Sequence, residues 1–255
     1  MAKNLNDVLA TYARDVFRKQ ADCDYISARA NYRMRLRQQF LWSAQQAIEK
    51  YLKAILLFNG KSARYYPSGT KQKEFKHNLE ALYGEVEKIP LLGFALEPEE
   101  QEFLAYLSAQ GGANRYLSTS AYNSGEVIHR LDRLVWSIRR YCQCFPDRHF
   151  GSKAPVPGLK ESFIRSISDP SVKKPPHTFS FFAGEGGELE DVLKRDSRDV
   201  ARRALVWANL YYGKKRRLRV TYDSFASTEG PPHERGWTGV DWEEVKKYVQ
   251  LPPSV

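Results

Sequence analysis

Residues 40–56 carry the strongest constraint on the fold, because their apolar side chains recur three and four residues apart, the spacing of one α-helix face. This stripe consists of Phe40, Ala44, Ala47, Ile48, Tyr51, Leu52, Ile55 and Leu56. Polar residues occupy the remaining positions. Asn59 and Gly60 follow, and both tolerate the left-handed conformation that ends a helix. The pattern predicts a core helix with a polar opposite face.

Further helical patterns fill the first 145 residues. They cover residues 5–19, 22–37, 76–88, 97–110 and a last segment that begins near Asn123 and continues to about residue 142. Residues 61–75 contain Pro67 and Gly69 and are predicted to form a loop. The economical arrangement is an antiparallel bundle of about four or five helices. The sequence therefore predicts a mainly α protein whose bundle occupies residues 1–145.

The second part of the chain has a different character. Residues 146–176 are rich in Pro, Gly and Ser, which predicts a linker or surface arm. Alternating patterns at 177–182 and 218–222 predict short strands, and residues 188–212 predict one long amphipathic helix between them. We therefore expect a small α+β extension over residues 177–255.

Composition excludes several classes of protein. The 255 residues are 42% hydrophobic and 27% charged, which is typical of a globular chain. The apolar run of the 40–58 helix is far shorter than the roughly 18 residues of a membrane span, and the N-terminus has no secretory core. The odd cysteine count predicts no disulfide framework, so we expect a cytoplasmic protein. Cys142, Cys144 and His149 lack the spacing of a metal site, and we expect no metal and no cofactor.

The charge balance favours a polyanionic partner, because 40 Lys and Arg face 30 Asp and Glu, a net charge of +10. One cluster concentrates this charge beside aromatic residues. It contains Tyr211, Tyr212, Lys214, Lys215, Arg216, Arg217 and Arg219. Such cations can neutralise phosphates while tyrosines stack on unpaired bases. The same cations could instead complement a helix dipole and protect an edge strand, so both interpretations stay open.

The order of polar residues on the central helix resembles a known family. Gln46-Ala47, Glu49-Lys50 and Leu52-Lys53-Ala54 are followed by His77 with Leu79 and Leu82 at helical spacing, and later by an Arg115-Tyr116 pair before the last helix. Over residues 12–145 this order resembles the HEPN domain, a helical bundle whose name stands for higher eukaryotes and prokaryotes nucleotide-binding.

The resemblance implies a role in a defence or toxin–antitoxin system. Members of the family fall into two groups with different activities. Many such domains are dimeric, metal-independent endoribonucleases that use an Arg and a His separated by four to six residues. No histidine of this chain follows an arginine at that distance. Other members bind nucleotides or nucleic acids, or pair with small nucleotidyltransferases. The missing motif favours this second group.

Three hypotheses follow. The leading one is an RNA-, nucleotide- or protein-binding domain, homodimeric by family analogy. The second is a ribonuclease with His77 as acid or base and Arg64 or Arg115 as phosphate clamp. The third is a structural subunit that docks a nucleotidyltransferase or nuclease through the polar face of the central helix, namely Gln46, Glu49, Lys50 and Lys53. Whether the protein is an enzyme stays open.

Overall fold

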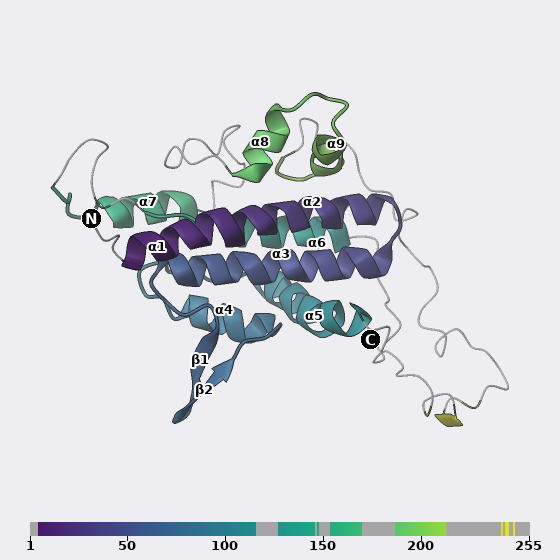
Figure 1. Ribbon diagram of the computed structural model, residues 1–255, viewed down its shortest axis with the longest axis horizontal. Helices are drawn as coiled ribbons and strands as arrows, with labels where there is room; N and C mark the ends of the chain where they lie inside the picture. Colours follow the sequence, from purple (N-terminus) through teal and green to yellow (C-terminus); the bar gives the residue numbers. More distant parts are fainter. Residues whose placement is uncertain are drawn as a thin grey trace.

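A helical bundle forms the body of the protein in the computed structural model (Figure 1). The structure describes residues 5–115, 127–145, 147, 154–169, 187–212, 241, 243–244 and 247. For residues 111–115 it describes the backbone and not the side chains. The helices are α1 (Leu5–Tyr12), the π-helix η1 (Ala13–Arg18), α2 (Lys19–Arg33), α3 (Arg37–Phe58), α4 (Leu79–Glu87), α5 (Pro98–Arg115), α6 (Val127–Arg139), α7 (Leu159–Ser168), α8 (Glu188–Lys194) and α9 (Val200–Val206). The strands β1 (Tyr65–Ser68) and β2 (Lys71–Glu74) form a hairpin. The prediction of a mainly α bundle is confirmed.

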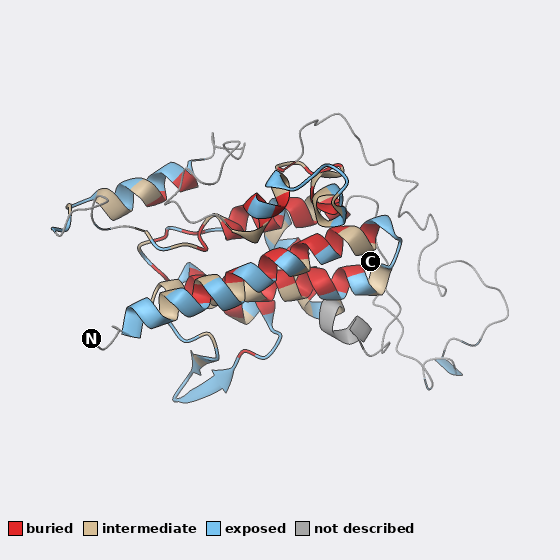
Figure 2. Cartoon of the chain, turned by 45° about the horizontal axis from the view of Figure 1, so that its top comes forward, coloured by how far each residue is buried: buried red, intermediate tan, exposed pale blue. Residues whose placement is uncertain are grey.

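The predicted core helix is α3, which packs against η1 and α1, α2, α4, α5 and α6. Its apolar stripe is buried along the whole length, from Phe40 to Leu56. The helix ends where the sequence predicts, because Gly60 adopts a φ of +66° and the amide of Lys61 donates to the carbonyl of Leu56 at 2.8 Å. Figure 2 shows the buried residues concentrated on the inner faces of α2 and α3.

Three predictions need correction, and three others lie outside the described residues. The predicted loop 61–75 contains the β1–β2 hairpin, and the predicted linker 146–176 contains α7, which buries Ile164 and Ile167. The predicted helix 188–212 is two short helices, because Asp199 caps α9 by accepting from the amide of Arg202 at 2.8 Å. The predicted strands at 177–182 and 218–222 lie outside the described residues, as does the predicted cap at Asn123.

The two C-terminal helices α8 and α9 pack on α2, on the opposite side of the bundle from the hairpin (Figure 1). Leu189, Val192, Ala204 and Leu205 join the hydrophobic core of the bundle. The predicted domain boundary near residue 145 stays a prediction. Residues 187–212 nevertheless share one core with residues that precede that boundary.

Buried charges fasten these helices to the bundle. Arg139 of α6 donates to Asp22 of α2 at 2.7 and 2.8 Å and to Glu190 of α8 at 2.8 Å through two nitrogens. Arg29 of α2 pairs with Asp132 of α6 and also donates to the carbonyl of Ala204 at 3.1 Å. Each buried guanidinium therefore has one partner within the bundle and another on a C-terminal helix. A buried charge requires such partners, because leaving it unpaired is costly.

Candidate functional site

A pocket of about 660 Å³ lies at the C-terminal end of α3, beside α1 and the base of the hairpin. Its apolar wall comes from α1, η1 and α3, and its polar wall comes from residues 60–64, 74 and 76. The lining residues are Leu9, Tyr12, Phe17, Lys53, Leu57, Gly60, Lys61, Ser62, Ala63, Arg64, Glu74 and Lys76. This volume lies within the range of small-ligand sites.

The chain reversal after α3 brings the cations of this pocket together. Ser62 Oγ accepts hydrogen bonds from the amides of Arg64 at 3.1 Å and Tyr65 at 3.0 Å, which turns the chain into β1. The amide of Phe75 then donates to the carbonyl of Arg64 at 3.0 Å and closes the hairpin. As a result, residues 61, 64 and 76, on either side of the hairpin, line one pocket.

Positive charge dominates the pocket wall, because Glu49 balances Lys53 while Lys61, Arg64 and Lys76 face only one carboxylate, that of Glu74. Arg64 Nε lies 3.3 Å from Glu74 Oε1, and both side chains are exposed. Such an exposed pair is weak and can yield to a ligand. Within the described part of the chain, neither Lys61 nor Lys76 has a carboxylate partner. The pocket is therefore suited to an anion with an apolar or aromatic portion.

Glu49 joins the pocket to His77. Its carboxylate accepts from Lys53 Nζ at 2.7 Å and lies 2.9 Å, through Oε2, from Nδ1 of His77. Because a carboxylate only accepts, this hydrogen bond places a proton on Nδ1 and leaves Nε2 as the proton-accepting nitrogen of the neutral ring. The side chain of Glu49 is 7% exposed, whereas that of His77 is 59% exposed.

Backbone contacts hold His77 in this position. Lys76 before it adopts a φ of +50°, and Asn78 after it caps α4 by accepting from the amide of Ala81 at 2.8 Å. Gln45 of α3 donates to the carbonyl of His77 at 3.2 Å. The helix therefore begins at Leu79 and not at the predicted residue 76, and His77 lies on the turn that leads into it.

The predicted catalytic residues fall into two groups. Arg64 lines the pocket, and His77 is linked to the same pocket through Glu49 and Lys53. Arg115 is the last residue of α5, and its side chain lies outside the described residues. The structure thus brings His77 and Arg64 to one end of the bundle without showing where the Arg115 side chain lies.

The predicted partner-binding face of α3 is more involved in internal contacts than its polarity suggests. Lys50 Nζ lies 2.5 Å from Asp24 Oδ2 of α2 and donates to Gln46 Oε1 at 3.2 Å. Glu49 is buried, contrary to the prediction of a polar exposed face, because His77 and Lys53 cover it. Gln46, Lys50 and Lys53 are partly exposed, and their role in docking a partner stays a prediction.

The predicted nucleic-acid cluster is described only at its beginning. Lys214, Lys215, Arg216, Arg217 and Arg219 lie outside the described residues. Tyr211 stacks on Trp136 with ring centroids 5.1 Å apart, and burial raises its pKa to about 12. Tyr212 is 7% exposed in the core. Both rings are engaged within the protein, so base stacking would require them to leave these positions.

Sequence reasoning missed most of the pocket. Lys61 begins the segment predicted to be a loop, Lys76 begins the helix predicted after it, and only the hairpin brings these two cations together. The one available signal was the i, i+4 pair of Glu49 and Lys53. Among the described residues, no group of three or more His, Cys, Asp and Glu side chains is placed to hold a metal ion. None of the helices that the structure describes is long and apolar enough to span a bilayer.

Comparison with known proteins assigns the bundle to a family. The family model of the HEPN domain matches residues 15–141, which include Lys53, Lys61, Arg64, Lys76 and His77. No curated protein and no solved structure matches the chain. The match ends before α7, so α7, α8 and α9 are additions to the matched segment. Residues 15–141 of this chain are therefore a HEPN domain.

Proposed function

We propose that this HEPN domain binds the phosphate groups of a nucleotide or of RNA in the pocket at the end of α3. The observation that carries the proposal is the charge of the wall, where Lys61, Arg64 and Lys76 face one carboxylate, that of Glu74, beside an apolar surface. Phosphates would pair with Lys61, Arg64 and Lys76. Tyr12 and Phe17, which lie on the apolar side, offer aromatic surface to a base.

A binding measurement tests this proposal. Fluorescence anisotropy would report the affinity for a labelled single-stranded RNA and, by competition, for a free nucleotide. Replacing Lys61 and Lys76 together by Ser is expected to weaken both ligands by about tenfold or more at low salt, because about two phosphate contacts are lost. The salt dependence of RNA binding should also become shallower by about 1.4 in its logarithmic slope.

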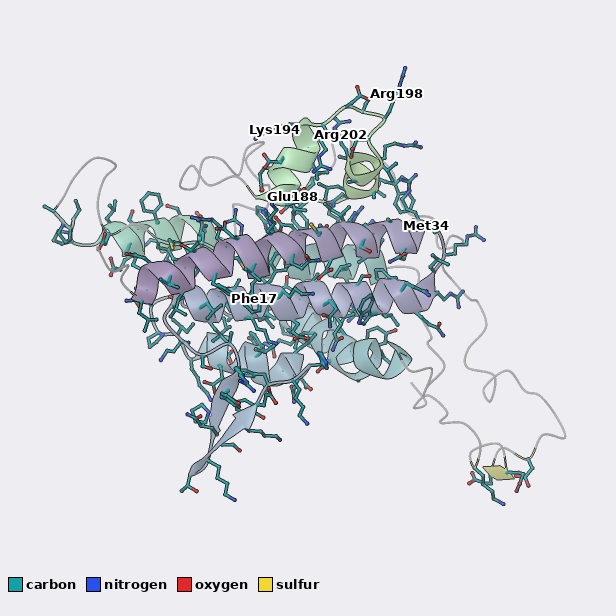
Figure 3. All side chains as sticks on the ribbon, viewed as in Figure 1. Phe17, Met34, Glu188, Lys194, Arg198 and Arg202 are labelled. Atoms are coloured by element: carbon teal, nitrogen blue, oxygen red, sulfur yellow. The ribbon has the colours of Figure 1, made fainter. Side chains whose placement is uncertain are left out.

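Lys194→Ser is the matched control. Lys194 is 73% exposed on α8, on the opposite side of the bundle from the hairpin, as Figure 3 shows. It has the same charge and pairs only with the exposed Asp191 within the described residues. Its replacement should leave both affinities unchanged. Equal affinities for the wild type and the Lys61/Lys76 variant would rule the pocket out as the binding site.

A second candidate function is metal-independent cleavage of RNA, and the contact between His77 and Glu49 specifically favours it. A histidine whose Nδ1 is held by a buried carboxylate and whose ring is exposed has the arrangement of a general base, here toward a 2′-hydroxyl. Arg64 in the neighbouring pocket would hold the phosphate. Incubation of labelled RNA with EDTA, beside His77→Ala and Arg64→Ala variants, distinguishes cleavage from binding. Intact RNA in every sample would exclude this activity.

The family setting adds a proposal about partners. A defence or toxin–antitoxin system would place a nucleotidyltransferase or nuclease beside this domain, with Gln46, Lys50 and Lys53 as exposed contacts on α3. Co-expression with the product of the neighbouring gene, followed by size-exclusion chromatography, tests for such a complex and for a homodimer. A single monomeric peak at high micromolar concentration would argue against both.

A further inference from the structure

The turn between α2 and α3 lies at the opposite end of α3 from the pocket. The helix begins here at Arg37, whereas the pocket lies beside Leu57 and Gly60. Its 22 residues span roughly 33 Å, so the two ends of the helix offer separate surfaces. Figure 3 shows Met34 at the end with the turn. We call residues 33–37 the α2–α3 tip.

Cations and apolar side chains alternate along the α2–α3 tip, which consists of Arg33, Met34, Arg35, Leu36 and Arg37. Met34 is 59% exposed and Leu36 is 42% exposed. No acidic residue occurs in the sequence between Asp24 and Glu49. The tip therefore combines exposed apolar surface with positive charge that its own segment does not neutralise.

The backbone of the tip departs from two local preferences. Arg35 adopts a φ of +62°, in the left-handed region that favours glycine. Its amide donates to the carbonyl of Tyr32 at 3.0 Å, and the amide of Leu36 donates to that of Asn31 at 2.9 Å, which ends α2. Leu36 is also the N-cap of α3, where Ser, Thr, Asp or Asn is favoured. Such departures occur mainly at functional sites, because a function compensates their cost.

Aromatic and cationic side chains of α3 and of the α9 region extend this surface. Trp42 lies about 9 Å from Leu36 along the axis of α3 and is 40% exposed. Arg33 donates to the carbonyl of Arg203 at 3.2 Å and lies over the ring of Trp207, 5.3 Å from its centroid. Burial and, second, the positive charge of Arg203 lower the pKa of Arg33, so the two cations act on one another. Among the described residues, neither of them has a carboxylate partner.

We infer that the α2–α3 tip docks the protein on the surface of an anionic lipid bilayer. Met34 and Leu36 enter the boundary between headgroups and acyl chains, while the arginines pair with lipid phosphates. Trp42 then lies at the level of the headgroups, where tryptophan is favoured. The cytoplasmic leaflet is negatively charged, so this role agrees with the expected cytoplasmic location. The inference concerns a second surface and does not depend on the proposed function.

Charge distinguishes the tip from the exposed apolar residues of α1. Leu5 is 69% exposed and Val8 is 42% exposed, but Asp7 lies between them in the sequence. An anionic bilayer would repel this carboxylate, whereas it attracts the arginines of the tip. A nucleic acid would also attract these arginines but would gain little from Met34 and Leu36. A bilayer removes both of these side chains from water, which favours lipid as the partner.

Vesicle flotation tests the inference with vesicles of phosphatidylcholine alone and of phosphatidylcholine with phosphatidylglycerol. We expect the protein to bind the anionic vesicles, and to bind them less tightly as salt is added. Met34→Ser/Leu36→Ser should lower this affinity by about tenfold or more, because two apolar side chains no longer enter the bilayer. Leu5→Ser/Val8→Ser is the matched control, since these side chains are similarly exposed at the other end of the bundle. It should leave the affinity unchanged.

Arg35→Gly separates binding from folding. Glycine accepts the φ of +62° without strain, so the variant should be as resistant to urea as the wild type. Its affinity for anionic vesicles should fall by about fivefold, the contribution of one arginine near such a surface. Arg35→Lys keeps the charge and should bind like the wild type. Tryptophan fluorescence should shift to shorter wavelength on binding, and Trp42→Phe should remove this shift.

The following outcomes would overturn the inference. One is a wild-type protein that does not bind anionic vesicles, and another is an equal loss of affinity in the tip variant and its α1 control. A third is a loss of RNA affinity in Arg35→Gly without any binding to vesicles, which would assign the arginines to nucleic acid. Lys61→Ser/Lys76→Ser should bind vesicles like the wild type, whatever its affinity for RNA or nucleotide. Failure of the tip and failure of the pocket can therefore be told apart.

Discussion

Arg139 and Glu190 face each other across the junction of α6 and α8, with two guanidinium nitrogens each 2.8 Å from a separate carboxylate oxygen. Their positions are 51 residues apart in the chain, and Arg139 lies within the matched HEPN segment whereas Glu190 lies beyond it. The pair is buried. It therefore ties the family domain to a segment that the domain match does not include.

Replacing Glu190 by Ala is expected to lower the free energy of unfolding by about 3 kcal/mol, because it removes one of the two buried carboxylates that compensate Arg139. Urea denaturation followed by circular dichroism measures the change. Asp191→Ala is the matched control, since Asp191 is 60% exposed and pairs with the 73% exposed Lys194 on the same helix. Its cost should stay below about 0.5 kcal/mol. Similar losses for the two variants would contradict this account of the junction.

The same pair predicts a dependence of stability on pH. Burial opposes ionisation of Glu190, but the charge of Arg139 outweighs burial and lowers the pKa of Glu190 to about 2 from an unfolded value of 4.5. The folded protein then binds fewer protons than the unfolded chain between these values, so the stabilisation is complete above pH 4.5 and is lost as pH falls toward 2. Its contribution should fall by about 1 kcal/mol between pH 7 and pH 4.

Glu190→Gln isolates this contribution from those of other titrating groups. The variant keeps the shape and an acceptor oxygen but does not titrate. Its unfolding free energy should therefore depend less steeply on pH than that of the wild type over the acid range. Urea denaturation at several pH values measures this dependence. If the unfolding free energies of the two proteins change with pH in parallel, Arg139 does not lower the pKa of Glu190.

The helical part of the fold was predictable because the relevant information is local. A helix that buries one face repeats apolar residues every three or four positions, and α3 shows this from Phe40 to Leu56. The hairpin gave no such signal, since almost every residue of β1 and β2 is exposed and no apolar alternation arises. Pro67 and Gly69 were correctly recognised as breakers of a helix, but Pro67 lies within β1, paired with Gln72, and Gly69 lies at the turn of the hairpin.

The remaining errors come from contacts that are distant in sequence. Glu49 occupies the polar side of α3, where exposure was predicted, yet His77 covers it from 28 residues away. Residues 188–212 keep helical periodicity through the break between α8 and α9, so periodicity alone could not reveal the turn that Asp199 caps. The pocket also depends on contacts distant in sequence, because its cations come together only once the hairpin is formed.

Lys76→Gly separates backbone strain from charge in the pocket. Lys76 has a φ of +50°, which costs a non-glycine residue on the order of 1 kcal/mol, while glycine adds a similar entropy to the unfolded chain. We therefore expect the unfolding free energy to change by less than about 1 kcal/mol. RNA affinity should fall, since the cation is gone. Lys76→Ser is the control: it should bind RNA as weakly as the Gly variant and be no more stable. An RNA affinity equal to wild type in both variants would remove Lys76 from the site.

Glu49→Gln is expected to strengthen RNA binding while weakening any cleavage. Glu49 pairs with Lys53 at 2.7 Å, so removing its charge leaves the Lys53 cation uncompensated in the pocket wall and should raise RNA affinity by about threefold. The same change removes the carboxylate that orients Nδ1 of His77, so a rate that depends on His77 should fall. Glu85→Gln on α4, which removes the partner of the exposed Lys88, should alter neither quantity. Anisotropy and the EDTA cleavage assay measure the two effects separately. Affinity that falls together with the rate would mean that Glu49 acts only by holding the local structure together.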